Sequence, residues 1–377
     1  MYMTKSLRKN RKFIFWLRIV SFSVIIIIVI LGAGIAFISK NPEQSALFAD
    51  NVLRPLIGDK AVIGLEGFVF NIQDNINRLY KHKPTANNYI SDVKTLPAVV
   101  SVITPPPNIT PYIDLGNPLS GEGKWKGIEG TDLFTTFIRT DSERPYSVVN
   151  LVYVPIKKLS IGVVAGTKYP GGPTFTPGPG MVPADIQQNA KLIAAFNGGF
   201  KEKDGHFGMY ADKTIYAPLK KGFATLFIYK DGHIELPSYD GSPLPDGVIA
   251  ARQNGFFLVE DGKTSKMTSL GIDWWAGTAT GGYVTWRSGI GVTENGDLIY
   301  AVGPSLTPTA LADALRLATS KNAMELDIND FWVRFTLFTW DSKNKTYTWS
   351  PLTKGLADGG KEFLHGYEKD FFYIYKK

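Results

Sequence analysis

Alternating apolar and polar side chains predict a chain built largely of β-strands. Residues 146–154 and 159–165 are rich in β-branched and other apolar side chains, as is typical of buried strands. Three Asp-Gly or Asn-Gly pairs, at 231–232, 261–262 and 295–296, follow or separate further runs of this kind. Such pairs suit the positive φ angles of tight hairpin turns. We therefore expect antiparallel sheet.

Helical spacing occurs in two places. Four apolar side chains between positions 42 and 80 recur on one helical face: Phe68, Ile72, Ile76 and Leu79. Thr307 followed by Pro308 is typical of a helix start, with an N-cap and a proline at the first helical position. The expected fold class is therefore α+β, a mixed, largely antiparallel sheet domain with packed helices.

An uncharged run at 19–39 predicts one transmembrane helix, because about 20 residues are needed to cross a bilayer. The alternative, a secretory signal, usually has a shorter apolar core. Six basic residues precede the run: Lys5, Arg8, Lys9, Arg11, Lys12 and Arg18. Since basic flanks stay in the cytoplasm, we expect 1–18 to be cytoplasmic and the remainder extracellular. The lipid bilayer is thus an expected partner, and the cell membrane the expected location.

The remaining chain is expected to have two parts. Residues 40–123 are interpreted as a membrane-proximal stalk and Pro-rich linker, because the run 104–107 cannot continue a helix or enter a central strand. The main domain is expected at 124–377. Of the net charge of +7, the six basic residues account for most, so the body is nearly neutral and a poor nucleic-acid binder. The absence of cysteine excludes disulfides and thiol chemistry.

The segment 323–330, with sequence AMELDIND, carries the most informative polar pattern. On a strand, Glu325, Asp327 and Asn329 would share one face, with apolar side chains on the other. Two neighbouring carboxylates repel each other unless another group compensates them. We therefore interpret this row as a wall of an active site.

A second candidate is the turn Asn197-Gly198-Gly199, at the end of an apolar run. Paired glycines let a backbone approach a ligand closely, so Asn197 and the two glycine amides are candidates for holding an oxyanion. A turn after a buried strand has the same composition. His206 follows shortly afterwards and is a candidate acid, base or phosphate donor, although a lone histidine is more often structural.

Two arginines add candidate cations. Arg287 lies at the start of a strand with small residues and is suited to clamp a phosphate, with an ion pair to Glu325 or Asp327 as the alternative. Arg252 and Asn254 add polar groups ahead of another strand.

Two further features of the sequence each allow two interpretations. Four nearby aromatic residues suit either sugar stacking or a core: Trp274, Trp275, Tyr283 and Trp286. The Gly/Pro-rich stretch 166–183 is either a flap beside the site or a surface loop.

Together, the segments 197–200 (NGGF) and 287–296 (RSGIGVTENG), followed by a helix and Leu326-Asp327, resemble the phosphodiester glycosidase family. The resemblance spans roughly 124–377. It implies an extracellular hydrolase that cleaves a sugar from a sugar-1-phosphodiester, in cell-envelope or exopolysaccharide metabolism.

The resemblance also implies roles for individual residues. Asp327 or Glu325 would activate water or stabilise the oxocarbenium-like transition state, and His206 would assist the leaving phosphate. Arg287 would bind the phosphate, and Asn197 would position a sugar or phosphate oxygen. The expected substrate- or phosphate-binding residues are Asn197, Gly198, Gly199, Arg252, Asn254, Arg287 and Asn329.

One departure from the family pattern affects the expected activity. In members of the uncovering-enzyme type a glycine-rich, serine-containing turn usually follows the Leu-Asp pair, whereas this chain has 328–332, with sequence INDFW. The departure implies altered activity, a different substrate or lost catalysis. A non-catalytic domain that binds cell-envelope glycans is therefore the alternative function.

We expect no cofactor and no metal site. One calcium hypothesis remains, with oxygen ligands from Glu325, Asp327, Asn329 and Asp330.

Overall fold

The computed structural model describes residues 44, 48–81, 83–85, 89, 95–97, 106–111, 115–172, 176–269 and 284–377. The predicted transmembrane run 19–39 lies outside the described residues, as do Trp274, Trp275 and Tyr283. Within the described ranges, no helix is both long enough and apolar enough to span a membrane. The chain divides between Val62 and Ile63 into two units, which are described separately.

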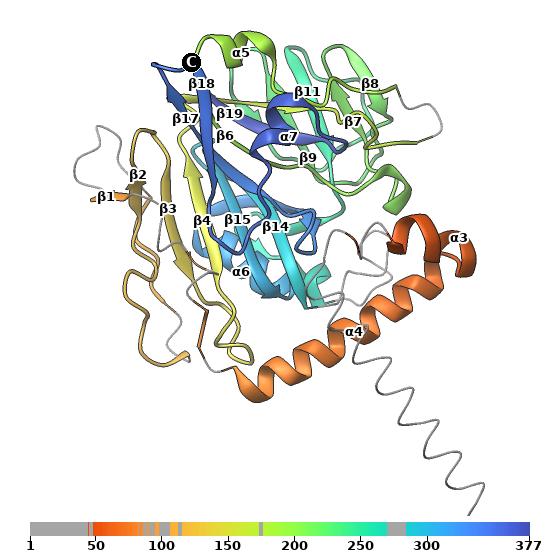
Figure 1. The fold of residues 1–377 in the computed structure, drawn as a ribbon, viewed down its shortest axis with the longest axis vertical. Coiled ribbons are helices and arrows are strands. Elements are labelled where there is room, and N and C mark those ends of the chain that lie inside the picture. The colour runs from red at the N-terminus through yellow and green to blue at the C-terminus, as the bar shows by residue number, and fades with distance from the viewer. Residues whose placement is uncertain are drawn as a thin grey trace, which may run out of the picture. The chain divides into compact units, whose positions relative to one another are not determined.

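Helices dominate the described part of the first unit. They are η1 (Ala49–Leu53), α3 (Arg54–Ile57) and the start of α4 (Asp59–Tyr80). Gly58 separates the last two because its φ of 82° interrupts helical geometry. The predicted helical spacing is confirmed, since Phe68, Ile72, Ile76 and Leu79 all lie in α4 (Figure 1).

The second unit contains three sheets, and every pairing between described strands is antiparallel. Sheet A has the order β1 (Thr95–Pro97), β2 (Lys126–Ile128), β3 (Phe134–Ile138), β4 (Val149–Val154), β15 (Leu298–Leu306), β14 (Thr285–Thr293), β16 (Ser320–Ile328), β12 (Phe257–Glu260) and β13 (Lys263–Thr264). The predicted antiparallel sheet is therefore confirmed.

Sheets B and C each have five strands (Figure 1). Sheet B has the order β18 (Thr346–Pro351), β17 (Phe335–Asp341), β6 (Leu192–Asn197), β19 (Phe371–Lys376) and β5 (Leu159–Val164). Sheet C has the order β10 (Ile234–Glu235), β9 (Thr225–Tyr229), β11 (Val248–Gln253), β7 (Met209–Ala211) and β8 (Thr214–Ala217).

Sheet A is covered on both faces, as two consecutive residues of β15 show. Ile299 packs with Leu311 of helix α6 (Pro308–Leu317) on one face. Tyr300 points to the other face, into a core that sheets B and C share, and its ring lies 4.8 Å from that of Phe196 in β6. Burial on both faces explains why the central strands are almost continuously apolar.

Short helices accompany the other sheets. Sheet B packs against α5 (Ala184–Gln188) and α7 (Gly360–His365), whose Ile186 and Phe363 share a core with Val164. Two 3-10 turns, η5 (Glu202–Asp204) and η6 (Lys266–Ser269), lie in connections between strands. Sheet B is thus covered by helices on the side away from the central core.

The local signals of the sequence are confirmed. Asp261 and Gly262 have φ angles of 46° and 72° between β12 and β13, as a tight hairpin requires. Gly232 and Gly296 also have positive φ in the other two predicted hairpins. The Thr307 hydroxyl accepts a hydrogen bond from the first turn of α6 at 3.0 Å.

The segment expected as a stalk and linker, 40–123, also contributes to the second unit. Its β1 pairs with β2, and its Ile109 is buried, with an N–H that donates to Gly123 O at 2.8 Å. Asp74 of α4 forms a buried ion pair with Arg144, with contacts of 2.9 and 2.7 Å. Strand β1, Ile109 and Asp74 therefore belong to the sheet domain rather than to a separate stalk.

Candidate active site

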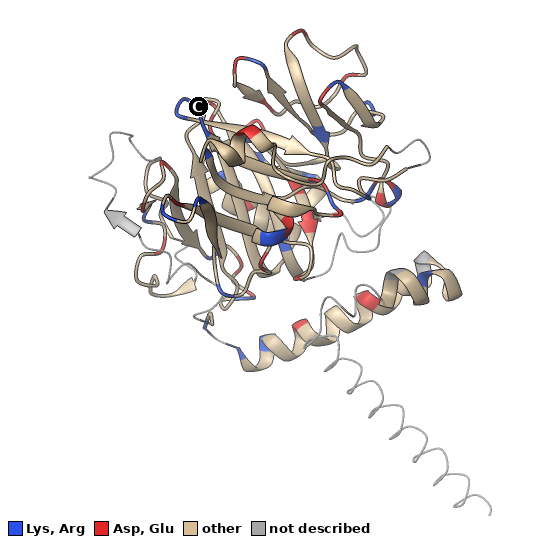
Figure 2. Cartoon of the chain, turned by 45° about the horizontal axis from the view of Figure 1, so that its top comes forward, with Lys and Arg blue, Asp and Glu red and all other residues tan. Residues whose placement is uncertain are grey.

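Strands from all three sheets end close together at one place. There β16 of sheet A ends at Ile328, β6 of sheet B at Asn197 and β11 of sheet C at Gln253, while Lys369 and Asp370 directly precede β19. Acidic and basic residues are otherwise interspersed over the chain (Figure 2). This junction contains most of the polar residues singled out in the sequence.

Asn197 links strands of two sheets at the junction. Its amide nitrogen donates to Gly198 O at 3.0 Å and to Ser288 Oγ at 2.9 Å. Its amide oxygen accepts from the Tyr300 hydroxyl and from the Arg334 N–H, both at 3.1 Å. An asparagine side chain has two donors and two acceptor positions, so these four bonds use its whole capacity.

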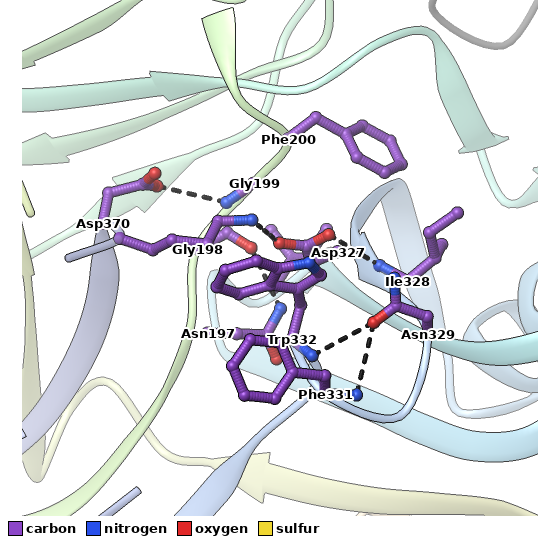
Figure 3. A network of polar contacts seen from close by, with 12 residues as sticks. Asn197, Gly198, Gly199, Phe200, Asp327, Ile328, Asn329, Phe331, Trp332 and Asp370 are labelled. Atoms are coloured by element: carbon purple, nitrogen blue, oxygen red, sulfur yellow. Dashed lines mark hydrogen bonds and ion pairs between the residues drawn. The ribbon is translucent and has the colours of Figure 1, made fainter. Parts of the chain in front are cut away.

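Of the two glycine amides predicted to hold an anion, that of Gly199 contacts a carboxylate of the protein itself, and that of Gly198 contacts a backbone carbonyl. Gly198 N donates to Asp370 O at 2.9 Å and Gly199 N to Asp370 Oδ2 at 3.1 Å (Figure 3). A Cβ atom on Gly198 would collide with the same carboxylate. The glycines are therefore needed for close approach to Asp370.

Arg252 completes this Asp370 network. Its guanidinium contacts both carboxylate oxygens of Asp370, at 2.8 and 3.2 Å, and donates to Gln253 O and Phe200 O. Asn254 joins the network to β16, since its amide donates to the carbonyls of Glu325 and Leu326, each at 2.7 Å. Arg252 and Asp370 are fully buried, and the network fastens sheets A, B and C together.

Arg287 and Glu325 form a second buried pair. Arg287 Nη1 lies 2.5 Å from Glu325 Oε1, and its Nε donates to Leu306 O at 2.9 Å. The other oxygen, Glu325 Oε2, is buried and has no hydrogen-bond partner among the residues that the structure describes. Burial raises the pKa of Glu325, with a smaller rise from nearby Asp327, while Arg287 opposes it. The ion-pair alternative for Arg287 is thus the arrangement observed.

The predicted strand alternation is interrupted before Asp327. Arg287 and Gly289, two residues apart on β14, pair with Ile328 and Glu325, three residues apart on β16. The extra residue makes a β-bulge, a feature that re-aims side chains near functional sites. Glu325 and Asp327 therefore contact different cations.

Asp327 forms an ion pair with Lys369, which precedes β19. Its other oxygen accepts from Ile328 N at 2.9 Å, and both charged side chains are buried. Burial raises the pKa of Asp327, whereas Lys369 and Lys201 act in the opposite direction. A raised pKa brings a carboxyl group closer to the range in which it exchanges protons during catalysis.

Asn329 lies beyond the end of the strand, with a φ of 66°, and does not continue its polar face. Its side-chain oxygen accepts from Phe331 N and Trp332 N, at 3.3 and 3.2 Å (Figure 3). Asparagine tolerates this left-handed conformation better than most residues and closes such turns itself. The turn that it closes places Trp332 beside Asp327 (Figure 3).

Two lysines and two aromatic rings form a group of contacts next to Asp327, whose carboxylate pairs with Lys369. Lys201 Nζ lies 4.7 Å from the ring centroids of both Tyr169 and Trp332, and Lys369 Nζ lies 4.6 Å from that of Trp332. Such distances correspond to cation–π contacts. Asp327, Lys201, Lys369, Trp332 and Tyr169 are called the Asp327 cluster below.

Asp204 and His206 lie in the segment that follows Lys201. Burial raises the pKa of Asp204, Lys201 and Lys369 oppose that shift, and Asp327 adds to it. His206 is exposed, and its Nδ1 lies 2.7 Å from the Glu202 carboxylate. The structure therefore places His206 in a surface pair, with Asp204 the nearby group that interacts electrostatically with the cluster.

Sequence reasoning missed Lys201, Lys369, Trp332 and Asp204. Lys369 is 42 positions from Asp327 and belongs to another sheet, so no spacing signal connected them. Tyr169 lies in the Gly/Pro-rich stretch 166–183, and its contact with Lys201 places this residue of the stretch beside the cluster. Trp332 belongs to the turn that departs from the family pattern.

Two further observations concern ligands. Among the residues the structure describes, no group of three or more His, Asp or Glu side chains is arranged to hold a metal ion. A cavity of about 320 Å³ lies at the other end of β16, where Arg316, Ser320 and Lys321 contribute to its lining. It does not include Asp327.

The chain matches no protein-family model and no curated protein sequence. Among solved structures it is similar to the catalytic domain of zebrafish N-acetylglucosamine-1-phosphodiester alpha-N-acetylglucosaminidase, auto-inhibited by its pro-peptide. That similarity has a TM-score of 0.43 and 13% identity, and covers 66% of this chain and 85% of that chain.

A hypothetical protein from Synechocystis gives a TM-score of 0.37 at 10% identity, covering 70% of this chain and 64% of that one. An exported protein of Burkholderia pseudomallei gives 0.30 at 8% identity, covering 60% and 74%.

Proposed function

We propose that this protein is a membrane-anchored extracellular hydrolase that cleaves a sugar from a sugar-1-phosphodiester, with Asp327 as the acting carboxylate. The substrate would belong to cell-envelope or exopolysaccharide metabolism. The observation that carries the proposal is the buried Asp327 carboxylate, placed beside Lys369, Lys201 and the ring of Trp332. The sequence resemblance supports the reaction class, and the uncharged run 19–39 supports the anchor.

The chemistry fits a phosphate leaving group. An alcohol leaving group needs strong protonation, so ordinary glycosidases use two carboxyl groups, whereas a phosphate departs more easily. One carboxyl group near cations then suffices to activate water or to stabilise positive charge on the sugar. Burial raises the pKa of Asp327, and this favours a role in proton transfer.

The other predicted residues take supporting roles in this proposal. Five of them make hydrogen bonds to other groups of the protein, among them Ser288, Asp370 and the Glu325 carbonyl: Asn197, Gly198, Gly199, Arg252 and Asn254. In this proposal these hydrogen bonds fix the positions of the strand ends of three sheets around the Asp327 cluster.

Arg287 and Glu325 support the bulge that turns Asp327 toward Lys369. In this proposal they position Asp327 rather than touch the substrate.

One observation favours a second candidate, a non-catalytic domain that binds envelope glycans. The turn closed by Asn329 carries two aromatic residues, the partly exposed Phe331 and the buried Trp332, where the family pattern has glycines. Aromatic faces stack on sugar rings without any reaction.

The experiment measures free sugar released from a panel of sugar-1-phosphodiesters, including a nucleotide-linked N-acetylglucosamine, by the full chain in detergent. Asp327→Asn is compared with Asp240→Asn, which changes an exposed aspartate of a distant loop. We expect a loss of about 100-fold or more for Asp327→Asn and none for Asp240→Asn. A loss below about tenfold rules out Asp327 as the acting carboxylate. Glycan binding without turnover by the wild type favours the second candidate.

A further inference from the structure

We propose that helix α4 lies in the surface of the lipid bilayer, with its axis along the membrane plane and one apolar stripe inserted among the lipids. The stripe consists of Leu65, Phe68, Ile72, Ile76 and Leu79, all in the second unit. The proposal rests on the proposed function for the anchor at 19–39 alone and does not depend on the reaction.

The stripe is apolar, continuous along the helix and largely uncovered. Its members follow one another at intervals of three or four positions, the spacing that places side chains on one side of a helix. Four of them are between 44% and 71% exposed, and Ile72 is partly buried. Adjoining exposed apolar side chains of this kind mark an interaction surface.

The opposite side of α4 is fastened to the sheet domain. Asp74 is buried and lies 2.7 Å from Arg144, and Gly67, two turns earlier on the same side, is also buried. Leu65 precedes Asp74 by about two and a half turns, so the two side chains point in opposite directions. Because the Asp74 contact fixes the rotation of the helix, the stripe faces away from the domain.

The exposed charges near the stripe suit anionic lipid headgroups. Among residues 64–81 and 83–85, which the structure describes, every exposed charged side chain is basic: Arg78, Lys81 and Lys83. Arg78 also contacts Glu143 at 3.4 Å, so the two lysines supply most of the attraction. Tyr80 is 80% exposed and adds a ring of the kind enriched at membrane interfaces. An apolar face with basic and aromatic flanks is typical of a helix that lies on a bilayer.

The place of the stripe in the chain favours the same partner. The uncharged run 19–39 ends about 25 residues before Leu65, so the proposed anchor would keep α4 close to lipid. The contact of α4 with lipid is then intramolecular, and even a weak affinity suffices at the resulting effective concentration. Apolar side chains are also exposed in η1 and α3, at Val52, Leu56 and Ile57. Exposed apolar residues therefore occur along the chain from η1 to the end of α4.

The test uses the full chain in vesicles of phosphatidylcholine and phosphatidylglycerol. Since the sequence contains no cysteine, each single-cysteine variant carries one nitroxide label at a known position. Phe68→Cys and Ile76→Cys probe the stripe. The matched controls, Asn71→Cys and Gln73→Cys, change exposed polar residues on either side of it. All four side chains are exposed, so the fold should be preserved, and thermal unfolding checks this.

Electron paramagnetic resonance then compares the collisions of each label with oxygen, which is enriched in lipid, and with a water-soluble nickel chelate. We expect the labels at 68 and 76 to lie about 5–10 Å below the headgroup boundary, with frequent oxygen collisions and few nickel collisions. The control labels should remain accessible to nickel.

Two results overturn the proposal. Frequent nickel collisions at 68 and 76 would place the stripe in water, and rare collisions with both reagents would show that protein, including a second copy of the chain, covers it. Ile27→Cys, within the run 19–39, tests the anchor separately. A label in lipid at 27 with labels in water at 68 and 76 rejects the helix contact and keeps the anchor, and the opposite pattern does the reverse. Sugar release by the same vesicles tests the reaction independently of both.

Discussion

The Asp370 network and the Asp327 cluster both place a buried carboxylate against a cation at strand ends. They differ in which protein groups contact the carboxylate and its cation. Asp370 receives both guanidinium contacts of Arg252 and the amide of Gly199, all within 3.2 Å. Asp327 shares its cation, Lys369, with the face of an aromatic ring. The Asp370 carboxylate accepts from a guanidinium and a backbone amide, whereas the Asp327 carboxylate accepts from a single ammonium group and a backbone amide. A glycine-rich motif can thus mark the support of a site rather than its contacts.

The largest expected effect comes from removing the centre of the Asp370 network. Asp370→Ala leaves Arg252 buried without its carboxylate, and breaking a buried pair in this way costs about 3–5 kcal/mol of unfolding free energy. Denaturant unfolding measures it, with Asp370→Asn as the variant that preserves shape. A loss below about 1 kcal/mol for Asp370→Ala would show that the network does not hold the sheets together.

A smaller loss is expected from crowding the same network. In Gly198→Ala the added methyl group meets the Asp370 carboxylate, and overpacking of this kind costs about 1–3 kcal/mol. The control is Gly64→Ala, because a methyl group added at Gly64 meets no other atom and its φ is not positive. Unfolding in denaturant compares the two, and equal losses would contradict the close approach to Asp370.

The Asp327 cluster should tolerate joint neutralisation. The double variant Asp327→Asn with Lys369→Gln removes both buried charges together, so we expect it to be within about 1 kcal/mol of the wild type in stability. Each single change leaves one charge unpaired and should cost more. A double variant less stable than either single variant would mean that this pair, like Arg252 and Asp370, is mainly structural.

The smallest expected effect is on how the unfolding free energy depends on pH through the protonation of Asp327. Because burial raises the pKa of Asp327 above its usual 3.8, its proton stabilises the folded state fully below pH 3.8, and this stabilisation is lost as the pH rises through the folded-state pKa. The unfolding free energy of the wild type minus that of Asp327→Asn, measured over a pH series, should therefore fall as the pH rises. A difference that grows with pH would show that Lys369 outweighs burial.

The parts of the fold that the sequence predicts are those with local causes. The turn at Asp261-Gly262 and the Thr307 cap depend on neighbouring residues, and both are found where expected. The Asp327 cluster depends on contacts between sheets, which no periodicity encodes. Lys369 and Lys201 lie far from Asp327 in the chain; the pairing of β6 with β19 brings them to one end of sheet B, and the packing of sheet B against sheet A brings them to Asp327.

The prediction that Glu325, Asp327 and Asn329 share one face of a strand was wrong. An alternating pattern predicts one shared face, but the bulge after Glu325 and the positive φ of Asn329 separate three polar side chains into three environments. A pattern of side chains contains no information on a register shift, which the partner strand imposes.

The ion pair between Asp74 and Arg144 has a practical consequence for producing the protein. Asp74 lies in helix α4, before the expected domain boundary at 124, and also accepts from the Tyr146 hydroxyl at 3.2 Å. A fragment that begins at 124 would lack this carboxylate and the buried Ile109, and would leave Arg144 with Asp141 and Glu143 as acidic neighbours. A soluble fragment for crystallisation or assay should therefore retain the whole of α4.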